Sequence, residues 1–262
     1  MTFKNQMDDF ISFANVLADE SAKVIMEYFR QTLTIENKDD DTPVTVADKK
    51  SELKIRELIN KSYPSHGILA EEFDNTNLDS EYIWVIDPID GTRSFVIASP
   101  TWSNLISVNY NREPILGLVN FPMLKKYYIT GVNKKSYLVE NNKFKRLKVL
   151  KSKSLNKSKI AGNFFGWLSL DEQKKISKLT KLIRFPCSDA LSYCQLCEGK
   201  LDVVLQCYNK IWDIHPMITL IKKAGGYITT WKGGDPRIGG SIVASSSKQI
   251  HKKVLNQLRP VI

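Results

Sequence analysis

Two carboxylates, Asp87 and Asp90, stand three residues apart in the stretch WVIDPIDGTRSF, which spans residues 84–95. The apolar run that precedes them predicts a buried strand, so both carboxylates follow directly on a strand. Pro88 fixes the backbone angle φ, and Gly91 permits a tight bend. We therefore expect a rigid turn on which the two acidic side chains converge.

The backbone just after this turn offers a second kind of group. We expect the N–H groups of Gly91 and Thr92 to lie unpaired beside the carboxylates, and such donors at the start of a helix attract phosphate. Carboxylate oxygens suit a hard divalent cation, so the turn could hold a metal ion and a phosphate together. A purely structural interpretation accounts for the same sequence: a strand followed by an aspartate-rich turn, in which aspartate acts only as a helix cap. The rest of the chain has to decide between these two interpretations.

Four more acidic residues lie at the edges of apolar segments. Glu71 and Glu72 follow the apolar residues 67–70, Asp41 belongs to an acidic loop, and Asp213 precedes a helical pattern. Each alone has a structural explanation, as a solvated strand end, a surface loop or a helix N-cap. The repetition weakens those explanations, because carboxylates from neighbouring strand ends can meet in space. A set of carboxylates without histidine or cysteine suits Mg²⁺ or Mn²⁺, and not zinc.

Hydrophobic periodicity predicts the elements that must position these side chains. Residues 8–33 and 46–61 have the spacing of amphipathic helices. Consecutive strand-like segments between 104 and 149 indicate an antiparallel portion, and strands and helices alternate in the second half, with one helix over 169–181. A lysine- and serine-rich connector separates the two patterns. We therefore divide the chain into an α+β subdomain, residues 1–148, with the acidic motifs, and an α/β subdomain, residues 149–262, with Asp213.

The composition excludes several classes of protein. A chain of 262 residues that is 42% hydrophobic can bury a sizeable core. Its formal charge of +10 favours anionic ligands, phosphorylated small molecules first and nucleic acid as the less focused alternative. No apolar span approaches membrane length, and acidic residues interrupt residues 1–20 where a signal peptide would be apolar. We expect a cytoplasmic protein with no membrane contact.

The four cysteines include a C-x-x-C pair, Cys194 and Cys197, on one face of a predicted helix over residues 189–199. A structural zinc site needs a second pair of cysteine or histidine ligands at suitable spacing, and none accompanies this pair. A reducing compartment keeps thiols unpaired. We expect buried thiols and not a zinc site.

Four segments in this order, V-T-x-A-D (44–48), E-E (71–72), D-P-I-D-G-T (87–92) and W-D (212–213), resemble the inositol monophosphatase superfamily. This superfamily holds Mg²⁺-dependent, lithium-sensitive phosphatases, and the resemblance covers essentially the whole chain. It implies an α/β (α+β) protein with a layered α-β-α-β-α sugar-phosphatase-type fold, two sheets and the metal site between them. It also implies a homodimeric phosphomonoesterase that uses two or three Mg²⁺ ions per site, or Mn²⁺, and water as the nucleophile.

The resemblance assigns roles to individual residues of this chain. The metal ligands would be Glu71, Asp87, the main-chain carbonyl of Ile89, Asp90 and Asp213. The phosphate- and substrate-binding residues would be Gly91, Thr92, Arg184, Cys187, Ser188, Asp189 and Gln206. Thr92 would also orient the attacking water, and Glu72 and Asp41 complete the catalytic set. The strict register of the first motif falls on Thr42, and we assign its role to Asp41, one residue earlier.

The residues after D-G-T bear on the substrate, which we expect to be a small phosphorylated metabolite. R-S-F at 93–95 and P-T-W at 100–102 look most like the histidinol-phosphate phosphatase branch. Asp189 could bind the ammonium group of histidinol phosphate through a charge-assisted hydrogen bond. Gln206 departs from the glutamate that is usual in both the histidinol and the inositol branches. Inositol 1-phosphate and 3′(2′),5′-bisphosphate nucleotides therefore remain alternatives.

A function of a different class is binding of RNA or of a transcription complex on the same fold, and the charge of +10 motivates it. A binding protein has no need to keep every metal carboxylate, whereas this chain has the full acidic set. We therefore expect an enzyme and no nucleic-acid partner.

Overall fold

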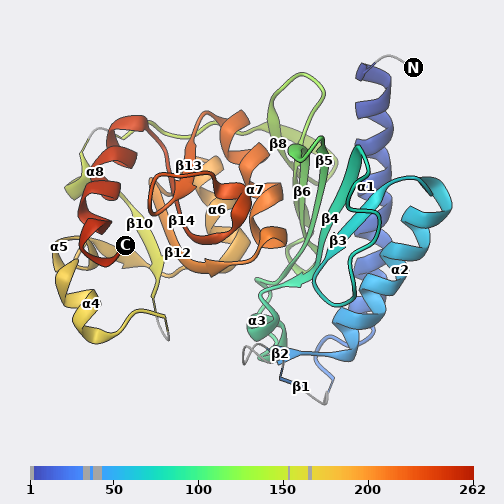
Figure 1. The fold of residues 1–262 in the computed structure, drawn as a ribbon, viewed down its shortest axis with the longest axis horizontal. Helices are drawn as coiled ribbons and strands as arrows, with labels where there is room; N and C mark the ends of the chain where they lie inside the picture. Colours follow the sequence, from blue (N-terminus) through green and yellow to red (C-terminus); the bar gives the residue numbers. More distant parts are fainter. Residues whose placement is uncertain (1–2, 32–35, 38–42, 153, 165–166) are drawn as a thin grey trace.

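The structure, a computed structural model, describes residues 3–31, 36–37, 43–152, 154–164 and 167–262 (Figure 1). The helices are α1 (Phe3–Met26), α2 (Val46–Ser62), α3 (Thr92–Val96), α4 (Leu170–Lys175), α5 (Ser177–Thr180), α6 (Asp189–Cys197), α7 (Ile211–Ala224) and α8 (Lys248–Leu258). The strands of the first half are β1 (Glu36–Asn37), β2 (Pro43–Val44), β3 (Gly67–Ala70), β4 (Tyr82–Asp90), β5 (Ser103–Tyr110), β6 (Glu113–Phe121), β7 (Lys126–Thr130), β8 (Ser136–Glu140) and β9 (Lys143–Arg146). The strands of the second half are β10 (Ile160–Asn163), β11 (Ile183–Phe185), β12 (Val203–Asn209), β13 (Tyr227–Thr230) and β14 (Gly240–Ser245).

The larger sheet has seven strands in the order β3-β4-β5-β6-β7-β8-β9. Only β3 and β4 pair in parallel, and every later neighbour is antiparallel. Short connections between sequential strands allow this meander. The antiparallel portion predicted from the sequence is confirmed.

The second sheet has five strands in the order β11-β10-β12-β14-β13. Strands β11, β10 and β12 are parallel, and β14 and β13 add an antiparallel edge. The parallel pairs need crossover connections, which contain α4, α5 and α6. This arrangement accounts for the alternation of strands and helices in the second half of the sequence.

The helices form layers on and between the two sheets (Figure 1). α1 and α2 pack on the outer face of the seven-stranded sheet, α5 and α8 pack on the outer face of the five-stranded sheet, and α4 contacts α5. α6 and α7 lie between the sheets, where the largest apolar cluster joins both halves of the chain. The predicted α-β-α-β-α layering is confirmed. Within the described residues, no helix combines the length and apolar character needed to cross a bilayer.

Three predicted elements end elsewhere in the structure. The first helix stops at Met26, because the next amides bond three residues back, as in Tyr28 N–H to Ile25 O at 3.0 Å. The helix expected over 169–181 is interrupted at Ile176, which separates α4 from α5. β4 continues through the expected turn as far as Asp90, so Asp87 and Asp90 both lie on this strand.

Candidate metal and phosphate site

β4 does not stop at the apolar run but extends to Asp90. Its pairing with β5 shifts in register between Asp87 and Asp90, so Pro88 lies in a bulge where its missing N–H costs no ladder hydrogen bond. Side chains three apart on a regular strand point to opposite faces, and a bulge re-aims one of them. The sequence predicted convergence through a turn, and the structure achieves it through a bulge.

Asp213 joins this pair from the second half of the chain. It is the third residue of α7, and Lys210 N–H donates to its Oδ2 at 2.8 Å. Carboxylate oxygens of Asp87, Asp90 and Asp213 all lie within 4.8 Å of one another. Three acidic residues separated by up to 126 positions therefore form one cluster, with Asp87 and Asp90 buried and Asp213 half-buried, which we call the acidic cluster.

Glu71 lies at the rim of the acidic cluster. It follows β3, whose last residue Ala70 pairs with Ile86, the residue before Asp87. Its negative charge contributes to raising the pKa of both Asp87 and Asp213. A cavity of about 480 Å³ opens beside it and is lined by Glu71, Glu72 and Trp212, among others.

The acidic cluster is electrostatically unfavourable without a cation. Burial, then repulsion from Glu71 and the other carboxylates, raises the pKa of Asp87 well above its usual value, and burial with neighbouring aspartates does the same for Asp90. The pKa of Asp213 rises to about 8, chiefly through burial. Asp87 Oδ1 is buried and has no hydrogen-bond partner among the described residues. Buried carboxylates need a positive partner or a proton, so the donor set fits a divalent cation.

The expected phosphate-binding backbone lies directly beyond β4. Gly91 adopts a left-handed conformation with φ of 78°, and Thr92 is the first residue of α3. The first amides of a helix have no acceptor within it, which leaves them available to a ligand. Thr92 Oγ1 donates to the carbonyl of Ile89 at 3.0 Å, so the hydroxyl and this carbonyl are held together.

Asp189, from the second half of the chain, borders Gly91 and is in turn held by Gln206. A Cβ atom at Gly91 would lie 3.0 Å from Asp189 Oδ2, which places the Asp189 carboxylate against this backbone. Gln206 Nε2 donates to Asp189 Oδ1 at 3.2 Å, and Gln206 Oε1 is buried without a partner among the described residues. Ala190 N–H donates to Asp90 Oδ2 at 3.1 Å. The first turn of α6 therefore contacts the acidic cluster directly.

The remaining predicted residues are placed less centrally. Burial raises the pKa of the Cys187 thiol to about 12, and Ser188 N–H donates to Ser192 Oγ at 2.8 Å, so the substrate-binding role of both residues stays a prediction. Arg184 is exposed on β11, and no hydrogen bond or ion pair within the described residues joins it to the acidic cluster. Asp41 lies outside the described residues.

The segment with Glu71 and Glu72 is held by Glu52, which the sequence analysis missed. Glu52 is fully buried on α2 and pairs with Arg56 at 2.8 Å. Its carboxylate accepts from the N–H of Glu72 at 2.7 Å and of Phe73 at 3.1 Å. The spacing of Glu52 and Arg56, four residues apart on a helix, was the only available signal, and it is common on surface helices.

Two further residues near the site were not assigned from the sequence. Asp48 accepts a hydrogen bond from Thr45 N–H at 2.8 Å and completes the capping box at the start of α2. Its negative charge also contributes to raising the pKa of Asp87. The T-x-x-D pattern could have indicated this cap. Arg93, on α3, attracts the carboxylate of Asp189 and thereby opposes the effect of burial on its pKa.

All four cysteines are free, and Cys194 and Cys197 are buried in the core between the sheets. Burial raises the pKa of Cys197 and of Cys194. Both thiols are therefore neutral and contribute to packing.

Comparisons with known proteins agree with this geometry. The model of the inositol monophosphatase family matches residues 6–262. The chain is 32% identical to the chloroplastic bifunctional phosphatase IMPL2 of Arabidopsis thaliana, over 97% of this chain and 76% of that protein. It is 30% identical to a histidinol-phosphatase of Mycobacterium tuberculosis, over 95% and 98% of the two chains. An inositol monophosphatase structure from Zymomonas mobilis superposes with a TM-score of 0.81 at 26% identity, over 96% and 98% of the chains.

The two layered sheets and the buried carboxylates between them define a metal-dependent phosphomonoesterase. The chain belongs to the inositol monophosphatase family.

Proposed function

We propose that the protein hydrolyses histidinol phosphate, with Mg²⁺ bound by Asp87, Asp90, Asp213, Glu71 and the carbonyl of Ile89. The observation that carries the proposal is the convergence of three carboxylates within 4.8 Å, one of which has a buried oxygen without a partner among the described residues. Oxygen donors alone favour Mg²⁺ or Mn²⁺. Bound divalent cations would neutralise phosphate charge and lower the pKa of a water molecule.

The protein's own groups would bind the phosphate and position the attacking water. The N–H groups of Gly91 and Thr92 hold the phosphate oxygens with fixed dipoles. The Thr92 hydroxyl, oriented by its hydrogen bond to Ile89 O, positions the attacking water. Glu72 and Asp41 complete the catalytic set in this proposal.

The substrate pocket of the proposal is formed from the second half of the chain. Asp189 faces Gly91 and would pair with the ammonium group of histidinol phosphate. Gln206 holds the Asp189 carboxylate in place, while Arg184, Cys187 and Ser188 form the outer wall. The similarity to the histidinol-phosphatase of Mycobacterium tuberculosis supports this substrate.

Inositol 1-phosphate is the second candidate. Gln206 is neutral, and an amide beside a carboxylate also suits a ring of hydroxyl groups. The similarity to the inositol monophosphatase of Zymomonas mobilis favours this alternative.

Phosphate release from a panel of substrates tests the proposal. The panel contains histidinol phosphate, inositol 1-phosphate, 3′-phosphoadenosine 5′-phosphate and fructose 1,6-bisphosphate, each with Mg²⁺ and with EDTA. We expect Mg²⁺-dependent turnover with the highest kcat/KM for histidinol phosphate. A higher kcat/KM for inositol 1-phosphate would show that inositol 1-phosphate, and not histidinol phosphate, is the substrate. Turnover that continues in EDTA would contradict the proposed metal-dependent mechanism.

A further inference from the structure

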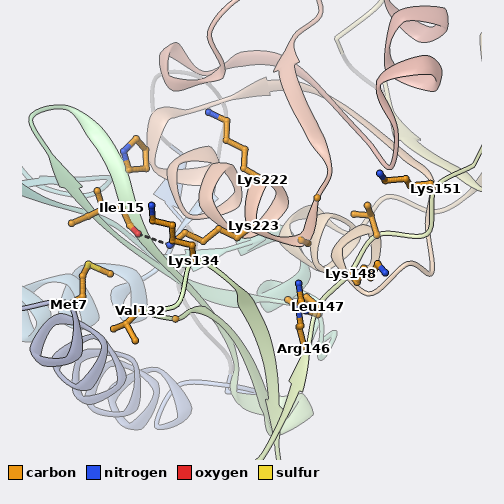
Figure 2. A pocket seen from close by; sticks show the side chains of 15 residues that line it. Met7, Ile115, Val132, Lys134, Arg146, Leu147, Lys148, Lys151, Lys222 and Lys223 are labelled. Carbon is orange, nitrogen blue, oxygen red and sulfur yellow. Dashed lines mark hydrogen bonds between the residues drawn. The ribbon is translucent and has the colours of Figure 1, made fainter. Parts of the chain in front are cut away.

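A cavity of about 810 Å³ lies away from the acidic cluster, where the end of α7 meets β6, the loop after β7 and the connector after β9 (Figure 2). It falls in the size range of small-molecule sites. Asp213 is in the first turn of α7, whereas Lys222 and Lys223 are in the last. Lys223 follows Asp213 by ten positions along α7, which is about 15 Å along the axis. The cavity is therefore distinct from the acidic cluster.

Six cationic side chains and no acidic ones are found among the residues that line this cavity. The cations come from three separate segments: Lys134; Arg146, Lys148 and Lys151; and Lys222 and Lys223. Within the described part of the chain, none of the six takes part in an ion pair. The negative end of the α7 dipole would account for the two lysines on α7, but not for the four from other segments.

Lys223 is fixed at the wall of the cavity. It is half-buried, and its Nζ donates to the carbonyl of Ile115 at 3.2 Å (Figure 2). Burial, and then repulsion from Lys134, lowers the pKa of Lys223. A bound anion would relieve this repulsion, because opposite charge favours the protonated lysine.

Apolar groups cover the rest of the wall. Met7, Ile115, Val132 and Leu147 lie around the same space as the cations (Figure 2). Inorganic phosphate alone would leave these groups unused, and a pocket with polar and apolar walls selects a ligand with both kinds of surface.

We propose that this cavity binds an organic polyphosphate of the nucleoside triphosphate type. Its phosphoryl groups contact Lys134, Arg146, Lys222 and Lys223, and its apolar part packs against Val132 and Ile115. Several cations that line one concave space match a compact ligand with several charges. An extended RNA would instead need a charged groove that follows its backbone.

Isothermal titration calorimetry with a non-hydrolysable ATP analogue, adenylyl imidodiphosphate, tests this site. The titration is done in EDTA at physiological salt, where the metal-free acidic cluster repels the analogue. We expect saturable binding with one molecule per chain, and weaker binding of inorganic tripolyphosphate because it lacks an apolar part. Absence of binding at millimolar analogue, or binding only of RNA, would overturn the proposal.

Matched variants distinguish specific binding in the cavity from non-specific attraction of the anionic analogue to a positively charged protein. Arg146→Gln with Lys222→Gln removes two exposed charges from the cavity, and we expect binding to weaken about tenfold or more. The control, Lys248→Gln with Lys252→Gln, removes the same charge from exposed positions of α8 and should weaken binding less than about twofold. Equal losses in both variants would contradict the site.

A third variant keeps the charge and fills the space. Val132→Trp places a larger side chain at the cavity wall on a half-buried position. We expect it to weaken analogue binding about tenfold while leaving the melting temperature within a few degrees of the wild type. Unchanged affinity in a folded Val132→Trp protein would show that the cavity is not the binding site.

Discussion

Asp87 combines three properties that rarely occur together in one side chain. It is 2% exposed, its Oδ1 has no partner among the described residues, and burial and neighbouring carboxylates raise its pKa. A structural aspartate would have a donor for each oxygen, because an unsatisfied buried acceptor is destabilising. The side chain is therefore arranged for a ligand, at the expense of the stability of the metal-free protein.

Replacing Asp87 with asparagine separates activity from stability. We expect Asp87→Asn to lower kcat/KM by about 10³-fold, equivalent to about 4 kcal/mol, because a carboxylate ligand is lost. The metal-free variant should melt at the same or a higher temperature, because a neutral amide avoids the burial and repulsion that raise the pKa of Asp87. Phosphate release and thermal melting in EDTA measure the two effects. Asp79→Asn, at an exposed position, is the control, and turnover equal to the wild type in Asp87→Asn would refute the assigned role.

Asp189 allows a test of substrate choice at a single residue. With Asp189→Asn, we expect the KM for histidinol phosphate to rise at least about tenfold, because the charge-assisted bond to its ammonium group is lost. Turnover of inositol 1-phosphate should change less, since that substrate has no cation. Steady-state kinetics on both substrates provide the comparison. An equal effect on both would show that Asp189 does not select an amine.

At the scale of elements, α7 links the acidic cluster to both sheets. Its first turn contains Asp213, and its middle packs on β6 at Gly117. A Cβ atom at Gly117 would overlap the carbonyl oxygen of Pro216 and lie 2.5 Å from Thr219 Oγ1. The helix can approach the sheet this closely only because position 117 has no side chain.

Enlarging Gly117 should therefore affect both stability and the site. We expect Gly117→Ala to reduce the free energy of unfolding by about 1–3 kcal/mol through overpacking, and to lower activity because α7 shifts Asp213. Urea denaturation and phosphate release measure these effects. Gly234→Ala is the matched control, since its nearest contact, Thr230 Oγ1, would lie at 3.3 Å. Stability equal to that of the control would contradict close packing at β6.

His251 connects α8 to the five-stranded sheet and makes that connection sensitive to pH. Its Nδ1 is 2.6 Å from Ser245 Oγ and its Nε2 is 2.9 Å from Thr229 Oγ1. Burial lowers the pKa of His251 from 6.5 to about 4. The unfolded chain therefore takes up the proton first as the pH falls. This contribution to stability is complete above pH 6.5 and is lost between pH 6.5 and 4.

The expected size of the loss is about 3 kcal/mol. It is measured as the difference in free energy of unfolding between the wild type and His251→Asn at each pH, so that other titrating groups cancel. The difference should shrink as the pH falls from 6.5 to 4. A difference that stays constant over this range would show that His251 does not titrate as proposed.

At the scale of the whole molecule, the acidic cluster joins the two halves of the chain. Asp87 and Asp90 come from the seven-stranded sheet, Asp213 comes from a helix between the sheets, and Ala190 N–H bonds to Asp90. Metal binding must therefore stabilise the contact between the halves, as any ligand stabilises the folded state that binds it. The division at residue 148 and the homodimer both remain predictions.

Mg²⁺ binding should release protons and depend on pH. The pKa of Asp213 is raised to about 8, so this carboxyl stabilises the metal-free fold at low pH and loses that contribution as the pH rises from 3.8 to about 8. Because Mg²⁺ binds the ionised form, we expect its affinity to increase from pH 6 to pH 8. At 100 times the Kd, Mg²⁺ should stabilise the fold by about 2.7 kcal/mol. Calorimetry in two buffers of different ionisation enthalpy measures the protons released, and a pH-independent affinity without proton release would contradict the assignment.

The sequence by itself determined the antiparallel first half, the alternation of strands and helices in the second half, and the acidic residues Asp87, Asp90 and Asp213 of the site, while the layering was implied by the resemblance to a known superfamily. These features depend on local patterns: apolar runs that end in carboxylates, alternating periodicity, and glycine where the backbone needs a left-handed conformation, as at Gly91. The D-P-I-D-G-T segment is short enough for its chemistry to be recognised from consecutive letters.

Only the tertiary structure decided how these residues meet. The bulge at Pro88 depends on strand register. Three other features join residues far apart in the chain: the support of Glu72 by Glu52, the contact of Asp189 with Gly91, and the cation-lined cavity at the end of α7. Such contacts leave no periodic signal, because burial and pKa depend on every group packed around a side chain and not on its neighbours in sequence.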